Sequence, residues 1–67
     1  MIEITINGEK KSFEKGLSIA QLLAKLELNS RAIAVEVNQE LRPRDTHETT
    51  EINAGDVLEI VTLVGGG

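Results

Sequence analysis

The first apolar residues of the chain alternate with polar ones. Ile2, Ile4 and Ile6 share one face of an extended segment, and polar residues separate them. This alternation predicts a half-buried β-strand near residues 2–7. Asn7-Gly8 follows directly, and this dipeptide favours a type I′ hairpin turn because both of its residues tolerate a positive φ.

The segment after that turn, near residues 9–14, is predicted to be a return strand. A two-residue turn would pair Ile2 with Phe13 and Ile4 with Lys11. Lys11 would then occupy an inward position, which favours an edge strand from which the lysine stem reaches water.

The pattern changes to a helical period after residue 17. The apolar stripe at i, i+3, i+4 and i+7 consists of Ile19, Leu22, Leu23 and Leu26. Ser18 is a suitable N-cap, and Gln21 completes a capping box three residues later. One amphipathic helix is therefore predicted within residues 18–28, with Asn29 as the left-handed residue that ends it.

Alternation returns at residues 33–38, which predicts a third strand. Leu41 is a short apolar point, but Pro43 lacks a backbone donor and so argues against a central strand there. The polar stretch 44–56 is predicted to be a connection that Ile52 anchors.

The last strand, near residues 57–63, is apolar on both faces. One face carries Leu58, Ile60 and Val64, and the other carries Val57, Val61 and Leu63. Because one helix covers only one face of a sheet, the second apolar row is left for a partner protein. We therefore expect Val57, Val61 and Leu63 to form a binding surface.

The order of elements is ββαβ(β)β, with one predicted helix. It predicts an α+β protein of β-grasp (ubiquitin-like) type, in which one helix packs on one face of a mixed sheet of four to five strands. The last strand would lie centrally, beside the first. We expect a single domain over residues 1–64 and a flexible glycine tail over 65–67.

Composition excludes several functions. The 67 residues include 7 basic and 11 acidic side chains, one aromatic and no Cys, which argues against nucleic-acid binding, thiolate metal sites and cysteine catalysis. No catalytic constellation is visible, and we expect His47 to be solvated in a polar loop. The longest apolar-rich run is too short to span a bilayer, so we expect a soluble, cytoplasmic protein.

The C-terminal Val64-Gly65-Gly66-Gly67 is the best candidate for chemistry. Glycine residues without side chains could thread an ionised α-carboxylate into a narrow enzyme channel, about 10 Å beyond the strand. The alternative is a frayed end without a function, since glycine loses the most entropy on ordering.

An ordered set of short motifs covers nearly the whole chain. They are Asn7-Gly8, Leu22-Leu23, Ala34-Val35-x-Val37-Asn38, Pro43-Arg44, Gly55-Asp56, Glu59-Ile60-Val61 and Val64-Gly65-Gly66-Gly67. In this order and spacing they resemble the ThiS family, the ubiquitin-like sulfur carriers of thiamin biosynthesis. Arg42, His47 and Lys11 depart from the usual pattern of that family, and all three lie outside the tail.

The resemblance implies a carrier rather than an enzyme. A ThiF-like adenylating enzyme would use ATP to adenylate Gly67, and a sulfur donor enzyme would convert the adenylate to a thiocarboxylate. A ThiG-like thiazole synthase would then consume the thiocarboxylate. Gly65 and Gly66 would thread the tail, and Val64 would join the partner-binding surface. Arg44 lies in the local basic spot Arg42-Pro43-Arg44, which is either a solvated turn or a partner contact, and Arg44 is the better candidate for such a contact. No tightly bound cofactor or metal is implied.

Three alternatives stay open on the sequence. The small subunit of molybdopterin synthase and a ubiquitin-like modifier share the β-grasp fold and the Gly-Gly end. A passive interaction module would differ from both, because it would keep its full activity after removal of the tail.

Overall fold

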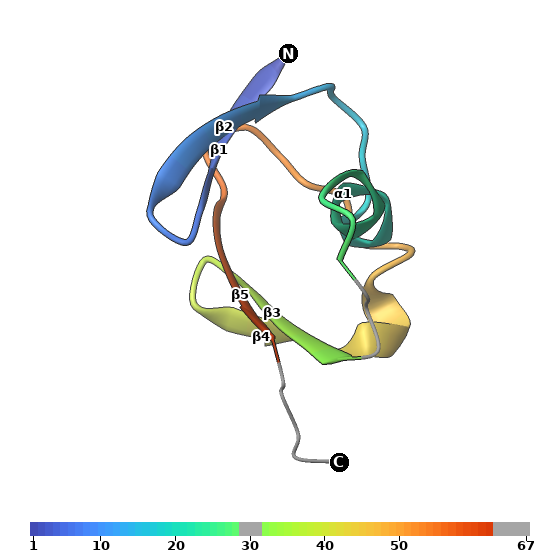
Figure 1. Ribbon diagram of the computed structural model, residues 1–67. Helices are drawn as coiled ribbons and strands as arrows, with labels where there is room; N and C mark the ends of the chain where they lie inside the picture. The colour runs from blue at the N-terminus through green and yellow to red at the C-terminus, as the bar shows by residue number, and fades with distance from the viewer. Residues whose placement is uncertain (29–31, 63–67) are drawn as a thin grey trace.

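Five strands and one α-helix make up the computed structural model, which describes residues 1–28 and 32–62. The strands are β1 (Ile2–Ile6), β2 (Glu9–Phe13), β3 (Ile33–Val37), β4 (Glu40–Arg42) and β5 (Val57–Thr62). The helix is α1 (Ile19–Lys25), and a short 3-10 helix, η2, spans Arg44–Thr46. The strands form one sheet in the order β2-β1-β5-β3-β4, with α1 beside it (Figure 1). The predicted β-grasp fold is confirmed.

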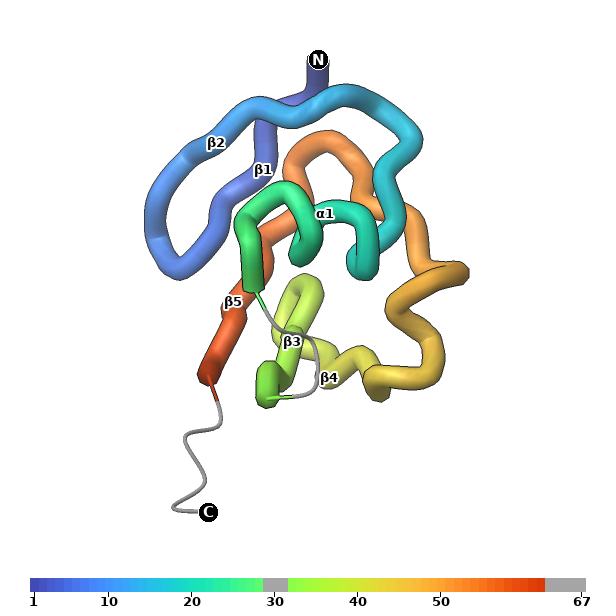
Figure 2. Tube along the Cα trace, turned by 45° about the vertical axis from the view of Figure 1, so that its right-hand side comes forward, coloured from blue at the N-terminus to red at the C-terminus, as the bar shows by residue number. Residues whose placement is uncertain are grey.

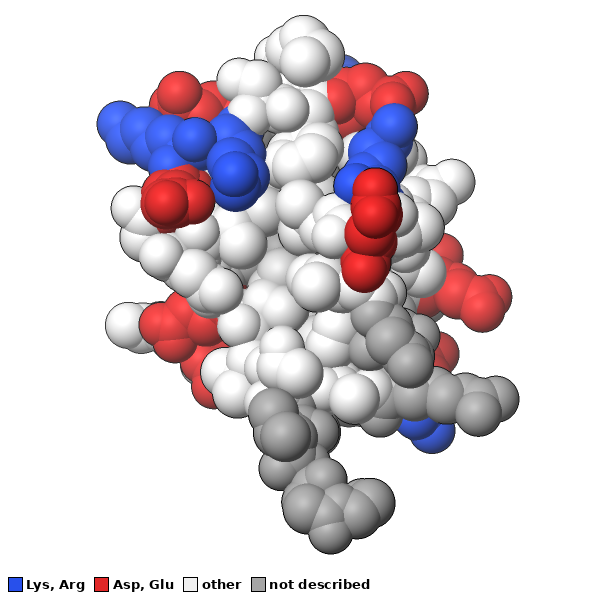
Figure 3. Space-filling model, viewed as in Figure 1, with Lys and Arg blue, Asp and Glu red and all other residues white. Residues whose placement is uncertain are grey.

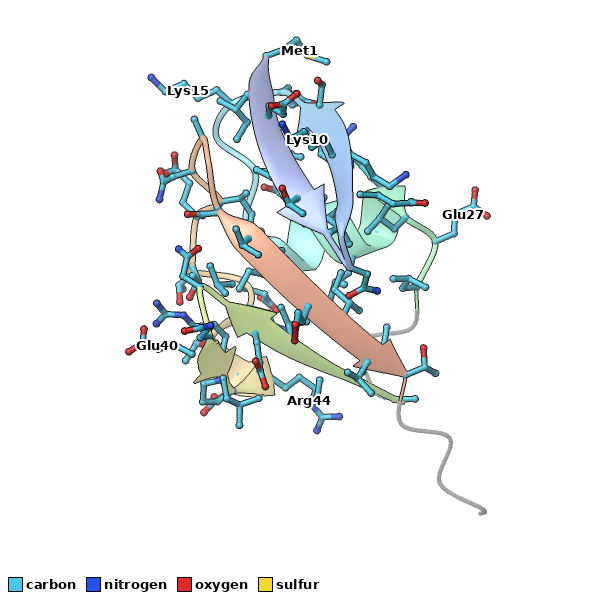
Figure 4. All side chains as sticks on the ribbon, turned by 90° about the vertical axis from the view of Figure 1, so that its left-hand side faces the viewer. Met1, Lys10, Lys15, Glu27, Glu40 and Arg44 are labelled. Carbon is cyan, nitrogen blue, oxygen red and sulfur yellow. The ribbon has the colours of Figure 1, made fainter. Side chains whose placement is uncertain are left out.

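The central strand is β5. It lies beside β1, as the sequence predicted, and it runs parallel to β1 and antiparallel to β3. Its pairing with β1 covers only Val57 and Leu58, whereas its pairing with β3 continues to Thr62. The C-terminal half of β5 therefore extends past the β1–β2 hairpin, as Figure 4 shows.

The first hairpin has the predicted register. Ile2 pairs with Phe13 and Ile4 with Lys11, and both turn residues have positive φ, 50° at Asn7 and 85° at Gly8. Strand β2 is an edge strand. Lys11 is exposed, and its Nζ lies 3.8 Å from Glu9 Oε1. Its charged end therefore stays in water, although its place in the strand is on the inward phase.

Helix α1 begins with the predicted capping box. The Ser18 side chain accepts from the Gln21 N–H, and the Gln21 side chain accepts from the Ser18 N–H. These two bonds satisfy backbone donors that would otherwise lack partners at the first turn.

The end of α1 differs from the sequence prediction. The left-handed residue is Glu27, with φ 59°, and Asn29 lies outside the described residues. The Glu27 N–H donates to the Ala24 carbonyl and the Leu28 N–H to the Leu23 carbonyl, which is a Schellman motif. Glycine usually occupies this position, because a side chain in left-handed backbone is strained.

One face of the sheet and the inner side of α1 form the core (Figure 2). Its buried members are Ile4, Ile6, Ile19, Leu22, Leu23, Ile33, Val35, Val37, Ile52, Leu58 and Ile60. Ile2, Phe13 and Leu26 pack at its border. The predicted apolar stripe of the helix therefore packs against the inward residues of the strands. Ile52 anchors the long connection in this core, as expected.

The expectation that His47 is solvated was wrong. Its side chain is only 3% exposed, and its Nε2 lies 2.8 Å from the Arg42 carbonyl oxygen. The His47 carbonyl also accepts from the Ala20 N–H at 2.9 Å. The start of α1 packs against the connection after β4. This contact buries the His47 ring, which the polar residues around it in the sequence had suggested would be solvated.

Candidate functional site

The sheet face away from α1 carries exposed apolar side chains. Val57 is 48% exposed and Val61 is 56% exposed, while Leu58 and Ile60 on the same strand are buried. The two valines thus lie on the face where the sequence placed a partner surface. Leu63 and Val64, which were predicted to belong to it, lie outside the described residues.

The strand register brings further residues to this outer face. Ala34 of β3 lies opposite Val61, and Glu36 lies between Glu59 of β5 and Leu41 of β4. Leu41 is 64% exposed. We define the outer patch as Ala34, Glu36, Leu41, Val57, Glu59 and Val61. Figure 4 views this face, with α1 behind the sheet.

Two carboxylates face each other directly in the outer patch. Glu36 and Glu59 are cross-strand partners, and like charges in that position oppose strand pairing. The ion pairs within residues 1–28 and 32–62 join Lys11 to Glu9, Lys25 to Glu14 and Arg42 to Glu40, and none involves this pair. A partner that placed a cation over the two carboxylates would relieve the repulsion.

Two asparagine side chains hold β5 from opposite sides. Asn7 donates from Nδ2 to the Ile60 carbonyl at 3.1 Å and accepts the Ile60 N–H at Oδ1 at 2.8 Å. Asn38 accepts the Val57 N–H at Oδ1 at 3.0 Å and donates from Nδ2 to Asp56 at 3.1 Å. Asn7 directly follows β1, and Asn38 directly follows β3. Each carboxamide therefore binds the backbone of β5 just past the point where the preceding strand stops pairing with it.

Arg44 begins η2 and is exposed. Figure 4 shows it beyond β4, toward the end of the sheet at which β5 ends. It is therefore not one of the outer-patch residues on the strands. Its predicted partner contact stays a prediction, and the glycines Gly65, Gly66 and Gly67 lie outside the described residues.

The described part of the chain offers little else for chemistry. It contains no group of three or more His, Cys, Asp or Glu side chains suited to a metal ion, and none of its helices has the length and apolarity needed to cross a membrane. An open hollow of about 300 Å³ lies beside Asn38, Gln39 and Val57. These three residues supply no titratable side chain. On the face drawn in Figure 3, charged groups flank an uncharged strip.

Comparison with known proteins identifies the family. The model of the ThiS family matches residues 3–67, which is almost the whole chain and includes the glycine tail. The chain belongs to the ThiS family.

Relatives and a solved structure agree with this assignment. The chain is 34% identical to the sulfur carrier protein ThiS of Bacillus subtilis, over 96% of this chain and 98% of that protein. A crystal structure of the thiamine biosynthesis protein ThiS from Geobacter metallireducens superposes with a TM-score of 0.84, at 28% identity, covering 98% of this chain and all of that chain.

Another relative is a much longer protein. The chain is 39% identical to the thiazole synthase of Paramagnetospirillum magneticum, but it spans only 20% of that protein. A segment similar to this ThiS-family chain is therefore part of that thiazole synthase.

Sequence reasoning missed four members of the outer patch. Ala34, Glu36, Leu41 and Glu59 reach it through strand register. A two-residue turn joins β3 to β4, but no local turn sets the register of β3 against β5. The alternation over residues 33–38 puts Ala34 and Glu36 on the face opposite Ile33, Val35 and Val37. Their neighbours across the sheet were not visible in the sequence.

Proposed function

We propose that this chain is a sulfur carrier of thiamin biosynthesis and that the carboxylate of Gly67 carries the sulfur. The observation that bears most of the proposal is the match to the ThiS family, which runs through Gly67. The similarity to the Bacillus subtilis sulfur carrier protein over nearly its full length supports the same function.

The chemistry requires activation of a poor electrophile. A Gly67 carboxylate oxygen attacks the α-phosphorus of ATP, the bond to the pyrophosphate leaving group breaks, and an acyl adenylate forms. A sulfur nucleophile at the oxidation level of sulfide then attacks the carbonyl carbon, and AMP leaves. The product is a C-terminal thiocarboxylate. In this scheme the chain is a substrate of an adenylating enzyme and of a sulfur donor enzyme.

The outer patch is the proposed docking surface for the adenylating enzyme. It spans β3, β4 and the central strand β5, which leads to the tail, and its exposed Val57, Val61 and Leu41 are apolar. Docking there would fix the sheet on the enzyme while the residues after Thr62 enter the active site. Arg44, near the same end of the sheet, would contact the rim of the partner.

A thiazole synthase is the proposed acceptor. The support is the thiazole synthase of Paramagnetospirillum magneticum, which contains a segment similar to this chain. Joining a donor and an acceptor in one chain raises their effective concentration, so a fused relative indicates two activities that work together.

ATP–pyrophosphate exchange with the cognate adenylating enzyme tests the proposal. The wild-type chain should support exchange. A chain with one residue added after Gly67 should not, because the addition moves the carboxylate by up to about 3.6 Å, and a misplacement of about 1 Å costs roughly 10²-fold in rate. Gly66→Val should also fail, because a stiff β-branched side chain widens the threaded segment.

If the chain with the added residue supported ATP–pyrophosphate exchange at the wild-type rate, the glycines would have no role. That result would favour a passive interaction module. Intact-protein mass spectrometry adds a direct assay. Material made with its native partners should contain a species with one sulfur in place of one oxygen. Transfer of that sulfur to a molybdopterin precursor, and not to a thiazole, would favour the molybdopterin synthase alternative, and stable attachment of the chain to other proteins would favour a modifier.

A further inference from the structure

We infer that Asn7 is a positioning residue for the tail, an assignment that rests on the proposed carrier function. Its carboxamide makes two hydrogen bonds to the backbone of Ile60, although the two residues are 53 positions apart in the chain. Ile60 lies two residues before Thr62, the last described residue of β5.

The backbone of β1 does not reach this part of β5. The Thr5 N–H of β1 donates to the Asp56 carbonyl, and the N–H of Asn7, the residue after β1, donates to the Leu58 carbonyl. Ile60 is the next β5 residue whose backbone N–H and carbonyl are bound on the β1 side. There the Asn7 side chain supplies the hydrogen bonds that a neighbouring strand backbone would otherwise make. Beyond Leu58, β5 is thus held by β3 on one side and by the Asn7 carboxamide on the other.

This position matters for delivery of the carboxylate. Docking fixes the outer patch on the enzyme, and the segment from Ile60 to Gly67 must then span a set distance to the reacting atoms. Seven residues cover up to about 25 Å, so a small change in the direction of β5 at Ile60 moves the point from which the tail enters the channel. The Asn7 bonds fix that direction from the hairpin side.

Asn38 provides a matched control. Asn7 and Asn38 have nearly the same left-handed backbone, with φ of 50° and 52°, and both side chains accept an N–H of β5. Asn38 holds Val57, at the opposite end of the strand from the tail. Glycine tolerates this backbone without strain, so Asn7→Gly and Asn38→Gly should both fold.

The test compares these two variants with the wild-type chain in ATP–pyrophosphate exchange over a range of carrier concentrations. Asn7→Gly should lower kcat by about tenfold or more, with little change in KM because the outer patch is intact. Asn38→Gly should leave kcat within about twofold of the wild-type value. Amide hydrogen exchange should show faster exchange at Ile60 in the first variant and at Val57 in the second.

An unchanged kcat for Asn7→Gly, an equal fall for both variants, or a rise in KM alone would overturn the positioning role. Should Asn7→Gly fail to fold, Asn7→Asp keeps an acceptor for the Ile60 N–H and loses the donor, and its kcat should fall by a smaller factor; an unchanged kcat would again overturn the role. A wild-type chain that supports no exchange defeats the proposed function itself, whereas a normal wild type with a normal Asn7→Gly defeats only the role of Asn7.

Discussion

The two faces of the sheet place side chains of the same strand in different environments. On the inner face Leu58 is fully buried beside Ile60, under helix α1, whereas on the outer face Val57 and Val61 are about half exposed, at 48% and 56%. The residues are neighbours in sequence and similar in chemistry. They differ only in which face of the strand they lie on, since successive side chains point to opposite faces. The position of a residue in β5 therefore decides whether a change affects the core or the proposed docking surface.

The largest expected effect is on the inner face. Leu58→Ala should lower the free energy of unfolding by roughly 2–5 kcal/mol, because it removes a fully buried side chain from the core and leaves a cavity. Val57→Ala, one position away and half exposed, should cost at most about 0.5 kcal/mol. Urea unfolding of both variants measures the difference. Equal losses would break the distinction between the faces.

A charge on the outer face should affect binding rather than folding. Val61→Asp should weaken binding to the adenylating enzyme by about tenfold or more, because it puts a carboxylate in an apolar contact. Ser12→Asp is the control for affinity, since Ser12 lies on the outward phase of edge strand β2, opposite Glu3. The new like-charged pair should lower the melting temperature slightly and leave binding unchanged. Calorimetric titration and thermal melting should show reduced affinity with an unchanged melting temperature for Val61→Asp only. Wild-type affinity would remove Val61 from the docking surface.

The end of the helix that covers the inner face allows a stabilising change. Glu27→Gly should raise the free energy of unfolding by about 0.5–1 kcal/mol, because glycine relieves the strained left-handed backbone that Glu27 adopts, and this gain exceeds its larger entropy loss. Thermal unfolding measures the shift, and Ala24→Gly within α1 is the control, expected to destabilise by a similar amount. A loss of stability in Glu27→Gly would show that the Glu27 side chain makes a contact worth more than the strain.

The smallest effect is expected within the outer patch. Glu59→Lys would place an ammonium group opposite Glu36 and should stabilise the sheet by about 0.2–1 kcal/mol, since it replaces a like-charged cross-strand pair by an opposite one. Denaturant unfolding at low salt measures it. The same variant should bind the adenylating enzyme more weakly if the partner supplies a cation there. A gain in stability with undiminished binding would leave the acidic pair without a role in recognition.

The features that sequence predicted are local ones. The register of the first hairpin follows from the Asn7-Gly8 turn, and the capping box of Ser18 and Gln21 lies within one helical turn. The apolar row of β5 was also visible, because alternation is a local property.

The features that sequence missed depend on distant segments. His47 is buried because the start of α1 lies against it, and the pairing of Glu36 with Glu59 depends on how β3 aligns with β5. Glu27 ends the helix although its residue type disfavours left-handed backbone, so residue preference alone pointed to Asn29. The tail residues, which carry the proposed chemistry, lie outside the described residues and stay predictions from the sequence.

The central place of β5 has a consequence for how the protein folds. Without this strand, the sheet would separate into two hairpins, β1–β2 and β3–β4, which share no ladder with each other, and an isolated hairpin is marginally stable at best. Closing the sheet also requires pairing residues as far apart as Asn7 and Ile60, and such distant contacts slow folding. We therefore expect a single cooperative unfolding transition, in which the outer patch and the C-terminal half of β5 form together or not at all.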